Sequence, residues 1–186
     1  MKTLQTLSLA TLLAASVGAQ AAGFSYDYLE GGFGELDEAD AIYLGGAKSL
    51  GKEFGLTGAL GLIDFDGGDG TVLRGGGLFH TPIQKDLDFV GTLELVFSDF
   101  EVDLPGGSVS DDDLGFAAGA GVRYSVQDNF QLEGKLVLVE VDPFDDGLGI
   151  SLNARYYMNR QLSAAVGVAD DADYDGLYVN LRYDLK

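Results

Sequence analysis

The chain has 186 residues, of which 46% are hydrophobic, and carries a formal net charge of −19. This length suits one domain, and the apolar content excludes an intrinsically disordered chain despite the charge. Nucleic acid is excluded as a partner, because binding phosphates takes a clustered basic surface and the eleven Lys and Arg residues are scattered. Glycine is frequent (28 residues), proline rare (3) and cysteine absent, which is typical of long β-strands without disulfides.

Residues 1–21 have the pattern of a secretory signal peptide. Lys2 gives a short positive region, residues 4–17 form an Ala- and Leu-rich core, and Ala19-Gln20-Ala21 is an A-x-A cleavage site. The apolar stretch is shorter than the roughly 20 residues of a transmembrane helix. No cysteine follows the site, which excludes a lipid anchor there. We therefore expect export, cleavage of residues 1–21, and a mature domain of residues 22–186.

From Phe24 onward the hydrophobic pattern has a period of two, which marks strands with one apolar and one polar face. In residues 88–99, for example, Phe89, Leu93 and Leu95 share one face and Glu94 lies on the other. The first two candidate segments alternate least clearly, so the sequence predicts eight to ten strands, with ten favoured. The candidate strands are residues 24–34, 41–50, 54–63, 71–80, 88–99, 114–125, 130–141, 147–158, 161–169 and 176–185.

Acidic residues mark every second connection. Twenty-one of the 30 Asp and Glu residues fall in five clusters without Lys or Arg, at residues 35–40, 64–69, 99–113, 140–146 and 170–175. The connections between them are short and carry Lys52, Lys85 and Arg160. Successive connections of an antiparallel meander lie at opposite ends of the sheet. We therefore expect acidic loops at one end and short turns at the other.

Strand length and face chemistry predict a membrane protein. The segments match the 9 to 11 residues of a tilted membrane-spanning β-strand, whereas globular strands average about 5 to 6. In a small barrel the polar face is the lumen, where opposite charges can pair and glycines such as Gly119, Gly121 and Gly149 relieve crowding. A soluble core would reject the charges on that face, which are Arg74, Glu94, Arg123, Glu133, Lys135, Arg155 and Arg182.

These features together predict an all-β fold, an up-and-down antiparallel transmembrane β-barrel of the bacterial outer membrane. Both termini would face the periplasm and the acidic loops the outside. A soluble periplasmic β-protein is the alternative. The expected partners are outer-membrane lipid, lipopolysaccharide and, during insertion, the barrel-assembly machinery, and a monomer is expected.

In this architecture the chain resembles the small outer-membrane β-barrel proteins of the OmpA, OmpX and opacity-protein group, over the whole mature length. A narrower resemblance is to the YfaZ family, and rests on Gly32-Phe33-Gly34 and on Gly75-Gly76-Gly77-Leu78 followed by Pro82. One feature departs from the group. Such barrels usually end in an aromatic residue that the assembly machinery recognises, whereas this chain ends Tyr183-Asp184-Leu185-Lys186.

The sharpest local motif is acidic. Residues 171–176 read D-x-D-x-D-G, and Asp171, Asp173 and Asp175 could wrap a divalent cation such as Ca²⁺ with oxygens. A calcium loop of the EF-hand type needs a bidentate Glu at its twelfth position, where Arg182 stands. A solvated acidic turn is the simpler interpretation, and no other cofactor is expected.

The sequence contains little that indicates a catalytic site. His80 is the only histidine, and by parity it lies on the lumen face near the short-turn end. Lipid A deacylases of this barrel type would be expected to carry a His-x-Ser pair, and Pro82 stands in place of that Ser. Glu94, Glu133 and Asp184 are predicted to form a salt-bridge network with the lumen cations rather than a catalytic site.

Aromatic residues gather near the short-turn end: Phe24, Tyr26, Tyr28, Tyr124, Phe130, Tyr156 and Tyr157. We expect them to form an interfacial girdle at the lipid headgroups. A platform that stacks on a ligand is the alternative.

The leading functional hypothesis is a non-enzymatic barrel with an envelope-structural or surface-interaction role. The first alternative is a narrow, cation-preferring, porin-like channel. The second is an outer-membrane enzyme that modifies lipid A or peptides.

Overall fold

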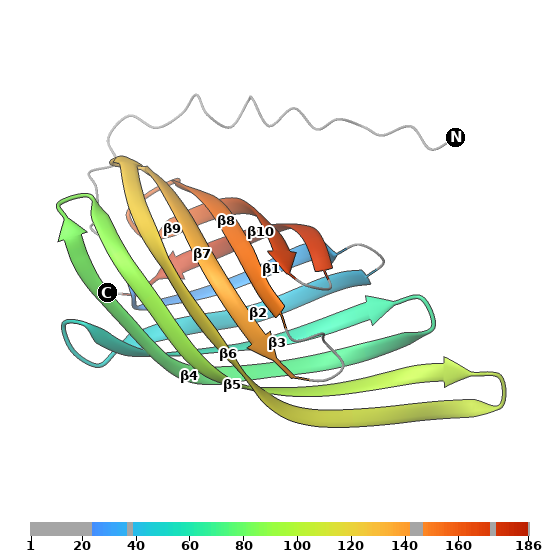
Figure 1. The fold of residues 1–186 in the computed structure, drawn as a ribbon. Coiled ribbons are helices and arrows are strands. Elements are labelled where there is room, and N and C mark those ends of the chain that lie inside the picture. The colour runs from blue at the N-terminus through green and yellow to red at the C-terminus, as the bar shows by residue number, and fades with distance from the viewer. Residues whose placement is uncertain (1–23, 37–38, 142–146, 172–173, 186) are drawn as a thin grey trace, which may run out of the picture.

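The computed structural model describes residues 24–36, 39–141, 147–171 and 174–185, which form a closed antiparallel β-barrel (Figure 1). Each strand pairs with its neighbours in the sequence, and the first strand closes the barrel on the last. The prediction of an up-and-down barrel with ten strands is confirmed. The strands are β1 (Tyr28–Leu36), β2 (Ala39–Ser49), β3 (Phe54–Phe65), β4 (Gly68–Gln84), β5 (Leu87–Leu104), β6 (Gly107–Gln127), β7 (Phe130–Glu140), β8 (Gly147–Tyr157), β9 (Leu162–Asp171) and β10 (Tyr174–Asp184).

The outer wall of the barrel is apolar, the reverse of a soluble protein. On β5, Leu93 and Leu95 face outward and are each 64% exposed, whereas the inward-facing Val96 is 0% exposed. The same alternation places Arg123, Arg155 and their charged neighbours on the inner face. A continuous outer band of leucines, valines and aromatic residues is stable only against lipid, because in water it would expose a large apolar patch. No helix in the described ranges is long and apolar enough to cross a membrane.

The two ends of the barrel differ as the sequence predicts. The connections after β1, β3, β5, β7 and β9 lie at one end, and they coincide with the five acidic clusters. The connections after β2, β4, β6 and β8 lie at the other end, which we call the short-turn end. Both ends of the described chain also lie there, where the Leu185 amide donates to the Asp27 carbonyl at 2.7 Å.

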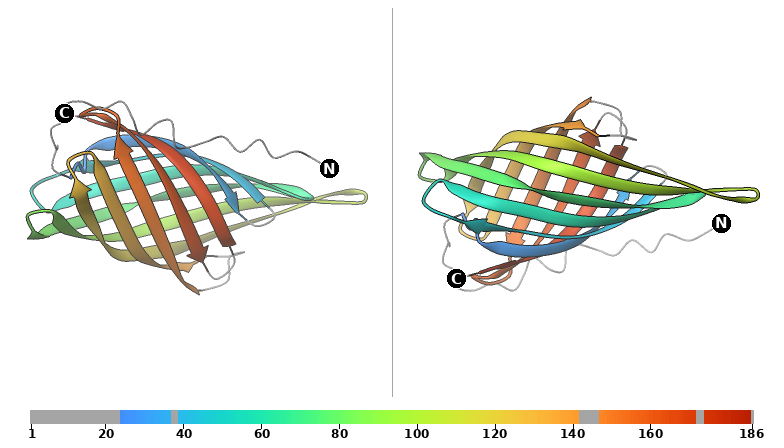
Figure 2. Two further views of the ribbon diagram at one scale, coloured as in Figure 1. Left: turned by 90° about the horizontal axis from the view of Figure 1, so that it is seen from above. Right: turned by 90° about the horizontal axis from the view of Figure 1, so that it is seen from below.

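The acidic cluster at residues 99–113 differs from its prediction as a loop. β5 and β6 have 18 and 21 residues and stay paired up to Leu104 and Gly107, so most of the cluster is strand. Only Pro105 and Gly106 form the turn, and the φ of Gly106 is 119°, a conformation that favours glycine. The acidic hairpin, residues 99–113, stays paired with β4 up to Val102, and its tip projects beyond the rest of the barrel (Figure 2). Its length was underestimated because exposed Asp and Glu are rare in strands.

The start of the first strand also differs. β1 begins at Tyr28 rather than at Phe24, and the segment before it turns into the barrel. Tyr26 is only 5% exposed and packs with Ala47, Leu78 and Val90, which all face inward. Residues 24–27 therefore lie across the lumen at the short-turn end.

Candidate functional site

The lumen contains a cavity of about 330 Å³ lined mainly by polar side chains. Inward-facing residues of β1, β2, β6, β7, β8 and β10 form its wall, because every second residue of each strand points to the lumen. Four cations but only two carboxylates line it, although the chain as a whole is strongly acidic. The lining residues are Tyr28, Glu30, Gly34, Ala41, Tyr43, Arg123, Glu133, Lys135, Ser151, Asn153, Arg155, Tyr178, Asn180 and Arg182.

One ion-pair cluster joins β6 and β7. Arg123 Nε donates to Glu133 Oε2 at 2.6 Å, and Lys135 Nζ lies 3.4 Å from Glu133 Oε1. Arg123 and Glu133 are direct partners in the strand register, so their side chains leave the backbone side by side. Arg123 is only 5% exposed, and a charge so well removed from solvent requires this pairing. The predicted pairing of Glu133 with lumen cations is confirmed.

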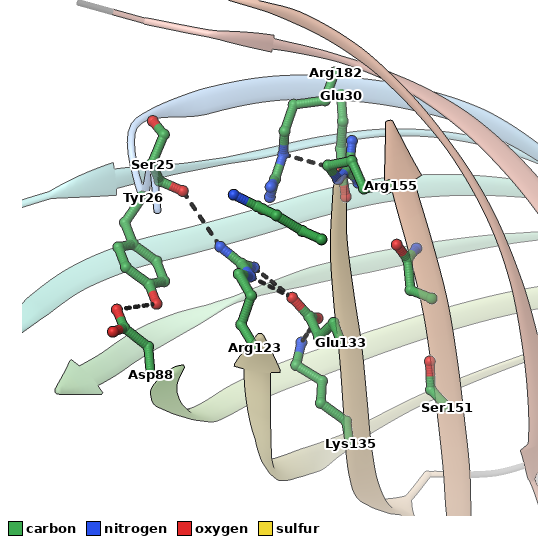
Figure 3. A network of polar contacts seen from close by, with 12 residues as sticks. Ser25, Tyr26, Glu30, Asp88, Arg123, Glu133, Lys135, Ser151, Arg155 and Arg182 are labelled. Atoms are coloured by element: carbon green, nitrogen blue, oxygen red, sulfur yellow. Dashed lines mark hydrogen bonds and ion pairs between the residues drawn. The ribbon is translucent and has the colours of Figure 1, made fainter. Parts of the chain in front are cut away.

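A second cluster centres on Glu30 of β1, across from the first (Figure 3). Arg155 Nη2 donates to Glu30 Oε2 at 3.2 Å and to Asn180 Oδ1 at 3.0 Å. Arg182 Nε lies 3.3 Å from the same carboxylate oxygen, and its guanidinium carbon is 3.3 Å from the centroid of the Tyr28 ring. One carboxylate therefore holds two guanidinium groups from different strands.

The segment at residues 24–27 is fixed to the inner wall by polar contacts (Figure 3). The Tyr26 hydroxyl donates to Asp88 Oδ2 at 2.9 Å, and its ring stacks on His80 with centroids 3.6 Å apart. Arg123 Nη1 donates to the Ser25 carbonyl at 3.4 Å, and its guanidinium carbon lies 5.0 Å from the Tyr26 centroid. The contacts reach β4, β5 and β6, so the segment narrows the lumen at the short-turn end.

The opposite half of the lumen, toward the acidic end, is apolar on the wall from β3 to β7. Val72, Val96, Phe100, Ala117 and Val139 form a buried cluster there, and each is at most 7% exposed. These side chains face inward and fill that part of the barrel interior. The polar cavity therefore lies between the wall formed by β8, β10, β1 and β2 and the part of β6 and β7 near the short-turn end.

Not every predicted network residue takes part. Arg74 and Glu94 face inward on β4 and β5 but do not line the cavity. Asp184 is 5% exposed, and among the described residues its carboxylate oxygens have no hydrogen-bond partner. The sequence reasoning missed Glu30, because the alternation of the first strand is interrupted by Gly31, Gly32 and Gly34.

His80 lies where it was predicted, on the lumen face near the short-turn end. The aromatic girdle was predicted from placement near strand ends, and only part of it lies on the outer wall. Tyr124 is 47% exposed on the outer wall, as a girdle requires. Tyr26 and Tyr157 are each 5% exposed inside the barrel, and the Tyr28 ring lies under Arg182. The girdle prediction is wrong for these three residues, because an aromatic ring at a strand end can point into the lumen as well as toward the lipid headgroups.

The calcium prediction falls at the edge of the described structure. Asp173 lies outside the described residues, and so do the side chains of Asp171 and Asp175. Elsewhere in the described ranges, no group of three or more His, Cys, Asp or Glu residues could hold a metal ion.

The fold has relatives among solved structures, although no family model and no curated protein matches the chain. The structure titled "KdgM porin" is similar with a TM-score of 0.52 at 10% identity, over 86% of this chain and 99% of that chain. The same porin with disordered oligogalacturonate gives a TM-score of 0.51 at 9% identity, over 86% of this chain and 99% of that one. The N-terminal barrel domain of Pseudomonas aeruginosa OprF is 15% identical with a TM-score of 0.48, over 87% of this chain and all of that domain.

The apolar outer wall, the polar lumen and the fold shared with the KdgM porin define the class. The chain has the fold of a small outer-membrane β-barrel. The narrower resemblance to the YfaZ family is not confirmed, since no family model matches.

Proposed function

We propose that the protein is a non-enzymatic barrel of the outer membrane with a closed lumen, and that its acidic end serves envelope structure or surface interaction. The observation that supports this most is the segment at residues 24–27. Tyr26 is 5% exposed between the inner walls of β4, β5 and β6, and obstructs the lumen at the short-turn end. The apolar cluster around Val96 and Phe100 fills part of the other half.

The acidic hairpin is the surface element of this proposal. Asp99, Glu101 and Asp103 are exposed on β5 in this hairpin, whose tip projects beyond the rest of the barrel (Figure 2). Paired strands present these charges in a fixed array, whereas a flexible loop would have to be ordered at an entropic cost on contact. Such an array favours a cationic partner, or divalent ions shared with lipopolysaccharide phosphates.

A channel is the second candidate, and the lumen changes its expected selectivity. The cavity is lined by four cations and two carboxylates, so the local field favours anions. A path through this cavity would therefore prefer anions, rather than the cations that the acidic composition suggested.

Conductance in planar bilayers tests the closed lumen. The purified, refolded mature chain should give no resolvable current steps under conditions in which a general porin conducts. Reproducible steps would contradict the proposal and favour the channel, and their reversal potential in a salt gradient would give the selectivity. Heat-dependent gel mobility of the same preparation provides the control for folding.

The enzymatic alternative depends on His80. Its ring stacks on Tyr26 at the short-turn end, away from the acidic end where the chain would meet surface substrates. A His80→Ala variant should therefore leave the lipid A and surface-protein profiles of cells unchanged. A profile that requires His80 would support the enzyme.

A further inference from the structure

The cavity in the lumen has an excess of positive charge among its lining side chains. Its charged lining residues are four cations and two carboxylates: Arg123, Lys135, Arg155 and Arg182, and Glu30 and Glu133. Two further carboxylates near this part of the lumen, Asp88 and Asp184, do not line the cavity. Asp88 accepts a hydrogen bond from the Tyr26 hydroxyl. Cations in a site partly withdrawn from water repel one another more strongly than in solvent, so an anion between them would be stabilised.

Arg182 is the residue that points most directly to a ligand. It is 3% exposed and lines the cavity, yet its Nε has no hydrogen-bond partner among the described residues. Glu30 Oε2 lies 3.3 Å away but outside hydrogen-bond geometry, and Tyr28 covers one face of the guanidinium. A buried donor left unsatisfied is unfavourable, and most such groups in proteins have a partner in the protein, an ordered water or a bound ligand.

Further donors surround the same space. Lys135 pairs with Glu133 at 3.4 Å, its side chain is 26% exposed, and it lines the cavity. Asn153 Nδ2 donates to the Tyr178 hydroxyl at 3.2 Å, and Ser151 Oγ lies 3.3 Å from that hydroxyl. Guanidinium, ammonium and hydroxyl groups around one cavity are the set that proteins use for phosphate and carboxylate oxygens.

We propose that this cavity binds a small dianion through phosphate or carboxylate oxygens, with Arg182 and Lys135 as its main donors. Its volume of about 330 Å³ lies within the range of small-molecule sites. Four cations and two carboxylates on the lining favour an anionic ligand. Gly34 and Ala41 line the cavity on β1 and β2 and leave room at the wall nearest the acidic end.

Calorimetric titration of the refolded mature chain in a zwitterionic detergent tests the proposal, with inorganic phosphate and succinate as separate probes. At least one probe should bind saturably with a stoichiometry of one. Lys135→Gln should weaken binding about tenfold, as expected for one charged hydrogen bond. Lys52→Gln is the matched control, because it removes the same charge from an exposed turn at the short-turn end. It should leave the affinity unchanged.

Arg182 is tested without removing it, because a substitution at this buried position leaves Glu30 without one of its ion-pair partners and destabilises the fold. The Nε–H resonance of Arg182 should shift in the NMR spectrum as the probe saturates. No binding of either probe up to about 10 mM would overturn the proposal. Equal weakening in the Lys135 and Lys52 variants, or binding without a shift at Arg182, would also overturn it, because each outcome places the anion elsewhere.

Discussion

Removing the Glu133 carboxylate should destabilise the barrel far more than removing a carboxylate at its rim. A Glu133→Gln variant leaves Arg123, which is 5% exposed, without its partner at 2.6 Å, and it also removes the partner of Lys135. Breaking a buried ion pair from one side costs about 3 to 5 kcal/mol. The Glu133 side chain is 21% exposed to the lumen, so we expect the lower end of that range, about 3 kcal/mol.

The matched control is the ion pair at the short-turn end. Lys48 Nζ lies 2.7 Å from Asp27 Oδ1, a distance as short as those in the lumen, but the Lys48 side chain is 64% exposed. Water and salt screen such a pair, so Asp27→Asn should cost about 0 to 1 kcal/mol. Since the contact distances are comparable, the difference between the two losses of unfolding free energy measures the effect of burial.

Equilibrium unfolding in urea, with the protein refolded into lipid vesicles, gives both values. The chain contains no Trp, so far-UV circular dichroism and heat-dependent gel mobility are the suitable signals. An Arg123→Met/Glu133→Leu double variant should recover most of the loss, because it removes both members of the most deeply buried pair. Lys135 also loses its partner in this variant, but its side chain is 26% exposed to the lumen. If Glu133→Gln and Asp27→Asn cost the same within about 1 kcal/mol, solvent screens the lumen as well as the rim and the reasoning fails.

Three other perturbations test the outer wall, the lumen segment and the rim. Leu95→Arg should cost about 2 to 4 kcal/mol in the same unfolding assay if Leu95, 64% exposed, faces the membrane interior. Tyr26→Phe should cost about 1.5 to 3 kcal/mol, because it removes the donor at 2.9 Å from the buried Asp88 carboxylate. The hydrogen bond from Lys48 holds the pKa of Asp27 below its ordinary 3.8. This contact therefore stabilises the fold above that pH and is lost as the pH falls, and an NMR titration should show Lys48→Gln raising the Asp27 pKa.

The sequence by itself determined the two faces of the barrel and its two ends, and it limited the strand number to eight to ten. These are local properties, because an alternation of period two assigns each side chain to a face before any strand has a partner. Leu95, Arg123 and His80 were thus placed correctly from their parity. The acidic and basic connections were separated by counting, since an up-and-down chain reverses direction at every turn.

Only the tertiary structure decided which inward-facing groups meet. Glu30 meets Arg182 because β1 and β10 pair when the barrel closes, and no local pattern encodes this contact between the two ends of the chain. The inward course of Tyr26 depends on a space bounded by His80 and Asp88 on other strands. Parity fixes the face of a residue, whereas register and closure fix its partners. The lumen cavity and its excess of positive charge therefore emerge only in the folded barrel.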